Sequence, residues 1–502
     1  MKRIWGRVCL AVGLTMSMLV SSAAAESGQT YRSYTEQSLI KQDGTFWTWG
    51  SMQPVPVQIH GMDDVVTVHD GGLIQLTDGT VHYTGRLQAG QPVEPVALPQ
   101  FDHLKQAMAD YSQLFIVDAD GGLTIVPLDS SGVTLEALQN SQPVPALEDV
   151  KKVSHYQEWD GNRTYQTIIA LKEDGTLWRG YKTENGTSSF TRIPNLDGAV
   201  DLQRNVARLS NGELRTWPIR EGTDSPVIST KVPINRSIAW LGTHRMANLA
   251  VDVDGRLWFW GNTVTGYSDG TEWHAQSSPI RFSALSDVRE AYVVERMIFA
   301  LTKQGELYAT SLNRQSMPAD ASFDLMAKDV RSVQAGSRHL MMERQDGTLW
   351  GWGVNKSAEL GVGDFTFMYD KPVPLLKPVS VVLNGQSVPL TGGALLHDGQ
   401  AFIPLRSVFE RLGATLTWDV LAKETLITGA ANGEAAPVQI RIGFTTGEVT
   451  IQDKPVLLPS KPFIIGSVSY VPLRLVSESL GATVHWSSEA RAVQITYPGK
   501  TN

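Results

Sequence analysis

The chain has 502 residues, of which 42% are apolar and 19% are charged. This length is too great for one hydrophobic core and predicts two or three domains. The formal charge of −8 at pH 7 argues against a nucleic-acid-binding protein, which needs a basic surface. The single cysteine, Cys9, excludes an internal disulfide and a thiolate metal site.

The N-terminus has the three parts of a secretory signal peptide. Residues 2–7 carry three basic side chains, Leu10–Val20 is apolar, and small residues lead up to Ala25. The alternative is a membrane anchor, but the apolar run is short for a bilayer span. Cleavage after Ala25 would remove Cys9 and take the charge from −8 to −11. With no later long apolar segment, we expect an extracellular or envelope-associated bacterial protein without a membrane span.

From there on, one turn unit recurs eight times at spacings of 35 to 54 residues. Asp-Gly between apolar residues is a strong hairpin signal and predicts a two-residue type I′ turn. An apolar strand precedes each turn and a strand that often carries aromatic residues follows it, as in Phe46–Gly50 and Leu257–Gly261. The eight turns are Asp43-Gly44, Asp78-Gly79, Asp120-Gly121, Asp174-Gly175, Asn211-Gly212, Asp254-Gly255, Gln304-Gly305 and Asp346-Gly347.

A second pair of strands lies between successive hairpins. An edge strand rich in Pro and Val, such as Pro54–Val57 or Pro372–Pro374, leads to a Val-x-x-Val strand such as Val150–Val153. Four short strands in about 40–45 residues are typical of a propeller blade. The variable spacing indicates loops of variable length on one face. A solenoid is the alternative, but the spacing lacks its stricter register.

The last unit carries a family resemblance. Val333–Leu340, the Asp346-Gly347 hairpin and Gly353–Asp364 together resemble the regulator-of-chromosome-condensation repeat, whose members usually have seven blades. The resemblance implies a seven- or eight-bladed propeller over residues 26–376, in a mainly β protein. The acidic charge and the leader argue against transferring the nucleotide-exchange activity of the best-known members.

From Lys377 the sequence pattern changes to two related segments. Ala401–Trp418 is echoed by Ser469–Trp486, each with a Pro-Leu-Arg start, a Leu-Gly-Ala segment and a Trp. Leu405, Val408, Phe409 and Leu412 form one apolar stripe of a short helix, and Leu473, Val476 and Leu480 repeat it. Gly413 and Gly481 are expected to end these helices in the left-handed region.

Residues 377–502 resemble the N-terminal, or stalk, domain of copper amine oxidases. The resemblance implies a non-catalytic α+β accessory domain made of two repeats, as on secreted proteins of Gram-positive bacteria of Paenibacillus type. Copper ligation in the enzymes needs a His-x-His pair, and none of the ten histidines forms one. Their cofactor arises from Tyr in Asn-Tyr-Asp/Glu, whereas Tyr369 follows Met368. The sequence therefore predicts no oxidase activity, no cofactor and no metal.

Other side chains could suggest chemistry, but each has a structural explanation. The turn carboxylates cap their own turns. Gly361–Asp364 lacks the Lys-Ser/Thr of a phosphate loop. His339 is expected to make a structural hydrogen bond, and Arg406 and Arg474 to pair with carboxylates within their repeats. The tryptophans of the hairpins could stack on sugars, but a core position is favoured for most of them: Trp47, Trp49, Trp258, Trp260, Trp350 and Trp352.

No catalytic residue, cofactor-binding residue or metal ligand is assigned. The sequence predicts a secreted or cell-surface binding protein that is not an enzyme. The propeller would be the recognition scaffold, with its ligand on the loop face, and the stalk domain would present or attach it. A protein, a peptide or a cell-wall glycan could be the partner. The alternative is a secreted hydrolase or lyase with a site on the propeller loops.

Overall fold

The computed structural model describes residues 31–498, with gaps. The residues outside it are 1–30, 86–92, 111, 131, 146, 160–163, 184–185, 188–189, 218–227, 245–246, 267–269, 398, 430–436, 474–478, 489 and 499–502. The predicted signal peptide, Arg474 and Val476 therefore lie outside the described residues.

In the described residues, the first part of the chain forms eight small antiparallel sheets, each built from consecutive strands. The first four blades comprise β1 (Tyr31–Tyr34), β2 (Ser38–Lys41), β3 (Phe46–Gly50) and β4 (Gln53–Ile59); β5 (Val65–His69), β6 (Leu73–Leu76), β7 (Thr80–Tyr83) and β8 (Val96–Asp102), with the 3-10 helix η1 (Asp70–Gly72); β9 (Gln106–Ala109), β10 (Gln113–Val117) and β11 (Leu123–Pro127), with α1 (Leu135–Gln139); and β12 (Val150–Trp159), β13 (Thr164–Lys172), β14 (Leu177–Thr183), β15 (Gly186–Thr187) and β16 (Thr191–Arg192).

The last four blades comprise β17 (Ala199–Gln203), β18 (Val206–Leu209), β19 (Leu214–Thr216) and β20 (Thr230–Lys231); β21 (Ile238–His244), β22 (Ala247–Asp252), β23 (Leu257–Thr265) and β24 (Glu272–Arg281); β25 (Val288–Val294), β26 (Met297–Thr302), β27 (Leu307–Ser311) and β28 (Asp324–Ala327); and β29 (Val330–Ala335), β30 (His339–Arg344), β31 (Leu349–Val354) and β32 (Met368–Pro374).

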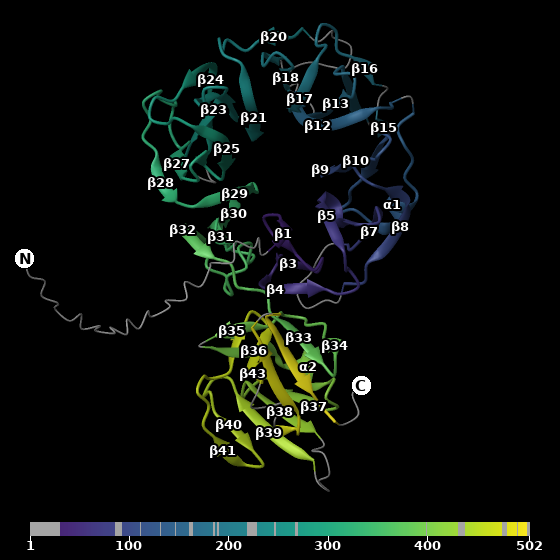
Figure 1. Ribbon diagram of the computed structural model, residues 1–502, viewed down its shortest axis with the longest axis vertical. Coiled ribbons are helices and arrows are strands. Elements are labelled where there is room, and N and C mark those ends of the chain that lie inside the picture. The colour runs from purple at the N-terminus through teal and green to yellow at the C-terminus, as the bar shows by residue number, and fades with distance from the viewer. Residues whose placement is uncertain are drawn as a thin grey trace, which may run out of the picture.

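These sheets stand around a ring as the blades of a propeller (Figure 1). The first strand of each blade lies next to the first strand of the following blade, from β1 through to β29. Each junction between blades holds an apolar cluster, such as the one that joins Phe299 and Leu301 of blade 7 to Leu340 and Trp352 of blade 8. The fold class predicted from the sequence is thus confirmed, and the described residues form eight blades.

The recurring turns are hairpins, but they are not type I′. In blade 1, Lys41 N donates to Thr45 O (3.0 Å) and Gly44 N donates to Lys41 O (3.0 Å), which closes a three-residue loop. Among the described turns, the glycine has positive φ, as Gly44 at 81° does, and the preceding Asp, Asn or Gln does not. This geometry is a turn with a glycine bulge, so the type I′ prediction is wrong because the loop has three residues.

The turn glycines also join each blade to the next. Gly255 O accepts a hydrogen bond from Val288 N at 2.8 Å, and equivalent bonds leave the turns of the other blades from the first to the seventh except the second, where the donor is His103 N, ahead of β9. A Cβ on Gly255 would lie 2.9 Å from Cα of Asp287 in the next blade. Glycine is therefore required twice here, once for its backbone conformation and once for the close approach of the neighbouring blade.

The ring closes between blades 8 and 1 without a shared strand, through side chains and through backbone hydrogen bonds such as Met52 N to Ser357 O at 2.8 Å. Every described sheet of the ring uses consecutive strands, so the first and last blades share none. Trp49 of blade 1 instead packs into a cluster with Met341, Leu349 and Leu360 of blade 8. Its Nε1 donates to Glu359 O at 2.9 Å. Apolar burial and hydrogen bonds thus replace a continuous sheet at this seam.

The C-terminal part is an α+β domain with three sheets and one described helix, α2 (Leu405–Phe409). Its strands are β33 (Ser380–Leu383), β34 (Gln386–Ser387), β35 (Leu395–His397), β36 (Gln400–Pro404), β37 (Thr415–Asp419), β38 (Glu424–Gly429), β39 (Val438–Gly443), β40 (Val449–Ile451), β41 (Lys454–Val456), β42 (Phe463–Ile465), β43 (Val468–Pro472), β44 (Thr483–Ser487) and β45 (Ala492–Thr496).

The two sequence repeats pair with each other in this domain. β36 and β43, the matching strands, lie antiparallel with Phe402 opposite Pro472. The predicted apolar stripe is buried: Leu405, Val408 and Phe409 of α2 lie in one core. α2 is shorter than expected, since it ends at Phe409, while Gly413 and Gly481 have positive φ as predicted.

The domain is packed against the rim of the ring, beneath blade 1 (Figure 1). Val55 of β4 is fully buried in a cluster with Leu395, Phe402 and Tyr470. A Cβ on Gly393 would lie 2.5 Å from Pro56 O, so the two backbones are in close contact. The C-terminal domain therefore contacts the propeller through a buried apolar surface.

This interface leads to a first prediction. Replacing Val55 by Asp buries a carboxylate among apolar side chains, which costs several kcal/mol. We expect the propeller and the C-terminal domain to unfold in two separate calorimetric transitions in this variant, whereas the parent chain unfolds with the two parts coupled. Val66→Asp is the matched control, because Val66 on β5 is 38% exposed. A single transition at the parent temperature in Val55→Asp would contradict the interface.

Candidate functional site

The two faces of the ring differ in their loops. Because the strands of each blade are antiparallel, the glycine turns between second and third strands lie on one face. The connections from first to second and from third to fourth strand lie on the other. On that face, the loop between the third and fourth strands varies in length: it comprises residues 51–52 in blade 1 and residues 355–367 in blade 8. We call the second surface the variable face.

Four of the turn aspartates cap their own turns, whereas Asp118 and Asp252 accept the corresponding hydrogen bonds in the turns of Gly121 and Gly255. Asp346 Oδ1 accepts from Thr348 N (2.9 Å) and from Thr348 Oγ1 (2.7 Å), and Thr348 Oγ1 accepts from Trp350 Nε1 (2.9 Å). Arg344 covers the Trp350 ring with its guanidinium carbon 3.9 Å from the ring centroid. The same Asp-Thr pair recurs at Asp174. These groups are engaged structurally, as the turn interpretation predicts.

The hydrogen bonds from Thr348 hold the pKa of Asp346 below its ordinary value. Stability from a depressed carboxyl pKa is present above the unfolded pKa and is lost as pH falls through the folded pKa. Thr348→Val removes the hydroxyl donor, so we expect the pKa of Asp346 to rise in a carboxyl carbon NMR titration. Thr176→Val is the matched control, which should raise the pKa of Asp174 and leave that of Asp346 unchanged. An unshifted Asp346 in Thr348→Val would contradict the assignment.

Polar groups along the inner strands join neighbouring blades. Lys152 of blade 4 binds Asp201 of blade 5, with Nζ 2.8 Å from Oδ1. Gln106 of blade 3 donates to Val153 O (3.2 Å) and accepts from Val153 N (2.8 Å). These polar side chains around the ring centre hold blades together.

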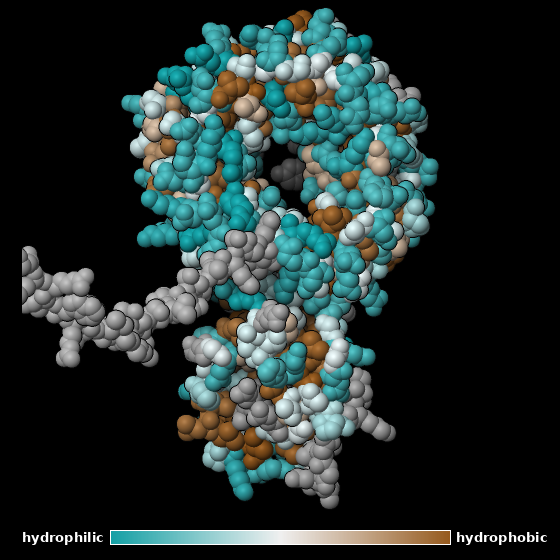
Figure 2. All heavy atoms as spheres, in the orientation of Figure 1, coloured by the Kyte–Doolittle hydropathy of each residue, from teal (hydrophilic) through white to brown (hydrophobic). Residues whose placement is uncertain are grey.

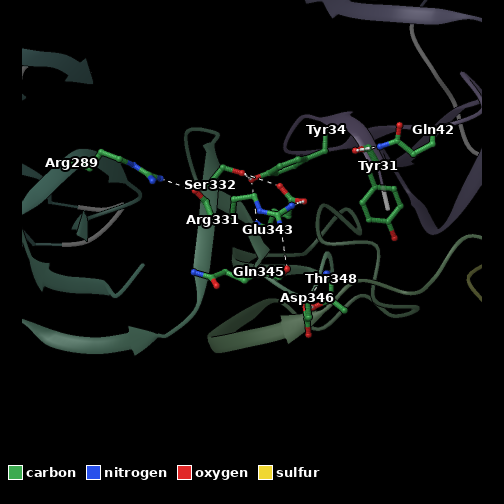
Figure 3. A network of polar contacts seen from close by, with 10 residues as sticks. All are labelled: Tyr31, Tyr34, Gln42, Arg289, Arg331, Ser332, Glu343, Gln345, Asp346 and Thr348. Atoms are coloured by element: carbon green, nitrogen blue, oxygen red, sulfur yellow. Dashed lines mark hydrogen bonds and ion pairs between the residues drawn. The ribbon is translucent and has the colours of Figure 1, made fainter. Parts of the chain in front are cut away.

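The closing seam has the most buried of these networks (Figure 3). The Glu343 carboxylate, 5% exposed, lies 2.9 Å from Arg331 Nη1 and accepts from Ser332 Oγ at 3.4 Å. Tyr34 crosses from blade 1, bonds Ser332 Oγ at 2.8 Å and accepts from Glu343 N at 3.2 Å. Burial raises the pKa of Tyr34, so its hydroxyl stays protonated. Arg289 of blade 7 donates to Arg331 O at 2.6 Å, which extends the network to a third blade.

The other side chains considered from the sequence have structural positions. Burial lowers the pKa of His339, which hydrogen-bonds the backbone of Glu36. Gly361 packs against Trp49 at the seam. Arg406 pairs with Glu410 at 3.6 Å on the surface of α2. The six hairpin tryptophans lie in or against core clusters, and only Trp258 and Trp350 are partly exposed.

A cavity of about 300 Å³ opens on the variable face between blades 6 and 7. It forms because β23 and β24 extend beyond the blade as a long hairpin beside the β25–β26 turn. Val264, Val293 and Leu312 form an apolar floor. The polar and aromatic lining residues are His244, Asn262, Thr271, Trp273, Glu295 and Arg296.

A second cavity, of about 230 Å³, adjoins the first and shares His244 and Val293 with it. It is lined by inner strands, with Trp240 and Tyr292 in edge-to-face contact at 6.2 Å between ring centroids. The ring is open at its centre, and hydrophilic residues cover most of the face turned to the viewer (Figure 2). The two cavities thus form one candidate binding site that runs from the variable face toward the ring centre.

The C-terminal domain has an apolar cavity of about 520 Å³ between its repeats. Its walls include Leu396, Leu473, Val484 and Trp486, and the fully exposed Leu457 stands at its edge. Apolar residues also gather on the visible surface of this domain (Figure 2). Such a cavity can bury an apolar group, and its described lining residues include no acid, base or nucleophile.

Within the described part of the chain, His, Cys, Asp and Glu form no group of three or more that could hold a metal ion. Over the same residues, no helix has the length and apolar character needed to span a bilayer.

The residues of the variable-face site were missed by the sequence analysis. Trp273, Asn262 and Arg296 lie in no recurring motif, and they meet only when the β23–β24 hairpin lies beside blade 7. One signal was available: the spacing from Gly255 to Gly305, at 50 residues, is among the longest between turns and indicates an enlarged loop. It could have indicated the blade but not the residues.

Comparisons with known proteins match the two parts of the chain separately. Residues 382–495 match the family model described as the copper amine oxidase N-terminal domain. Solved structures similar to the chain include human WBSCR16, 17% identical, with a TM-score of 0.40 over 58% of this chain and 86% of that one. They also include yeast RCC1 (Prp20) bound to Kap60, 13% identical, with a TM-score of 0.40 over 75% of this chain and 91% of that one. Both resemblances stated from the sequence thus reappear: the C-terminal region resembles the copper amine oxidase N-terminal domain, and regulator-of-chromosome-condensation proteins are among the matched structures.

Proposed function

We propose that the protein is an exported, non-catalytic binding protein of the bacterial cell surface. In this proposal the propeller recognises the partner. The C-terminal domain presents the propeller or attaches it to the cell envelope. The leader-like segment at residues 1–25 supports export.

The observation that carries the proposal is the place of the C-terminal domain. It is packed at the rim of the ring through Val55 and Phe402, in line with the plane of the ring (Figure 1). Both faces of the propeller are therefore left clear of the domain. A rigid ring on a side-mounted domain is a suitable scaffold for recognition by loops.

The chemistry of the variable-face site also supports binding over catalysis. A hydrolase or lyase would use a pair of carboxyl groups or an equivalent acid and base. Among the described residues, the lining of this site has one carboxylate, Glu295, and one imidazole, His244, and Arg338 holds the carboxylate with Nε 2.8 Å from Oε2. Arg338 thus occupies both carboxylate oxygens that a general acid or base would direct at a substrate.

The test is sedimentation of the chain lacking residues 1–25 with purified cell-wall sacculi from a Gram-positive bacterium. We expect the protein to pellet with sacculi and to remain soluble without them. Fractionation of cells that express the complete chain should place it in the wall or the medium. A protein that stays in the cytoplasm, or that never pellets with sacculi, would contradict the proposal.

A further inference from the structure

Trp273 is unusual among the tryptophans of the ring. Its side chain is 47% exposed at the edge of the variable-face cavity, whereas Trp47, Trp49 and Trp352 are at most 3% exposed. Trp273 lies on β24, beyond the body of the blade. An exposed indole offers a flat apolar surface with a polar N–H at one edge, a combination enriched at binding sites.

The polar lining suits a ligand with many hydroxyl groups. The imidazole of His244, the amide of Asn262 and the hydroxyl of Thr271 can each both donate and accept hydrogen bonds. Arg296 fixes the extended hairpin to blade 7, since it donates to Gly266 O and, at 3.2 Å, to Thr271 Oγ1. The site is therefore braced by contacts of its own.

The lining carries little charge in its described residues. These include one carboxylate, Glu295, and one guanidinium, Arg296. Glu295 is bound by Arg338 of blade 8, at 2.8 Å and 3.4 Å from its two oxygens. A phosphate or another polyanion would be expected to need several cations, and a basic peptide several carboxylates. The lining matches neither of these.

We propose that this cavity binds a neutral saccharide, with the apolar face of one sugar ring against Trp273 and its hydroxyl groups bonded to the polar lining. This inference rests on the proposed function and names the ligand class of its recognition element. A cavity of 300 Å³ is at the small end for ligand sites, which suits one unit of a longer chain. The adjoining cavity of 230 Å³ would take the next unit toward the ring centre.

The test applies the complete mature chain, fluorescently labelled, to an array of neutral oligosaccharides, acidic oligosaccharides and wall stem peptides. We expect signal on neutral oligosaccharides. Trp273→Ala should weaken that binding by roughly tenfold or more, as truncation of a central aromatic anchor does. Trp273→Phe keeps a stacking ring and should retain most of it. Trp418→Ala is the matched control, since Trp418 is 39% exposed in the C-terminal domain and should bind as the parent does.

Three outcomes would overturn the assignment. These are no signal on any neutral oligosaccharide, unchanged binding by Trp273→Ala, or binding confined to acidic glycans or peptides. Unaltered circular dichroism of the variants would show that the propeller is intact. Sedimentation with sacculi separates this inference from the proposed function: a parent chain that pellets with sacculi but gives no signal on any neutral oligosaccharide refutes the saccharide site and leaves surface binding in place.

Discussion

Replacing Gly255 by Ala is expected to lower the free energy of unfolding by about 2–4 kcal/mol. Two effects add. Gly255 has φ of 75°, which costs an L-residue about 1–2 kcal/mol. The new Cβ would also lie 2.9 Å from Cα of Asp287 and push blade 7 away from the turn. That displacement would lengthen the bond from Val288 N to Gly255 O, now 2.8 Å.

The control for this prediction isolates the second effect. Gly61 has the same φ of 75°, but a Cβ there meets nothing within 4 Å. Gly61→Ala should therefore lose only the conformational part, about 1–2 kcal/mol. Denaturant unfolding of the two variants measures the difference. Equal losses would mean that contact between blades contributes nothing to the requirement for glycine.

The second large effect is expected at the closing seam. Trp49 is 3% exposed, and removal of a buried aromatic side chain typically costs about 3–5 kcal/mol. Trp49→Ala also leaves Glu359 O without its indole donor. Because no strand crosses this seam, we expect hydrogen exchange to accelerate chiefly in β1–β4 and β29–β32, where the ring would open first.

Trp260→Ala is the matched comparison within the ring. Trp260 is also buried, at 6% exposure, in the cluster between blades 5 and 6. The chain runs directly from blade 5 to blade 6, so a weakened junction there remains tethered. We expect a similar loss of stability with exchange faster only near that junction. Equal exchange at the seam in both variants would contradict the seam, which no strand crosses, as the weak point of the ring.

Much of the fold could be predicted from local sequence. The eight glycine turns fix the hairpins, and the apolar stripe of Leu405, Val408 and Phe409 fixes the first helix of the C-terminal domain. Local residues determine these features. The turn type was wrong because Lys41 pairs with Thr45 across three residues, a register that the Asp-Gly pair alone does not specify.

Contacts between distant residues could not be predicted in this way. Tyr34 and Ser332 meet only because the ring closes, and nothing in either segment identifies the other. The sequence around Val55 predicts an ordinary edge strand, although Val55 is buried against the C-terminal domain. The candidate site depends on where the β23–β24 hairpin lies relative to blade 7, and hairpin length alone leaves that position open.

Because every described blade is one uninterrupted stretch of chain, the propeller is modular at the level of the gene. A duplication or deletion of one such stretch adds or removes a complete sheet, and no remaining sheet has to exchange a strand. The two ends of the ring also meet at the seam between Tyr34 and Ser332. Ring size in this architecture can thus change by whole blades during evolution, and a rearranged gene that begins at another blade would encode the same ring.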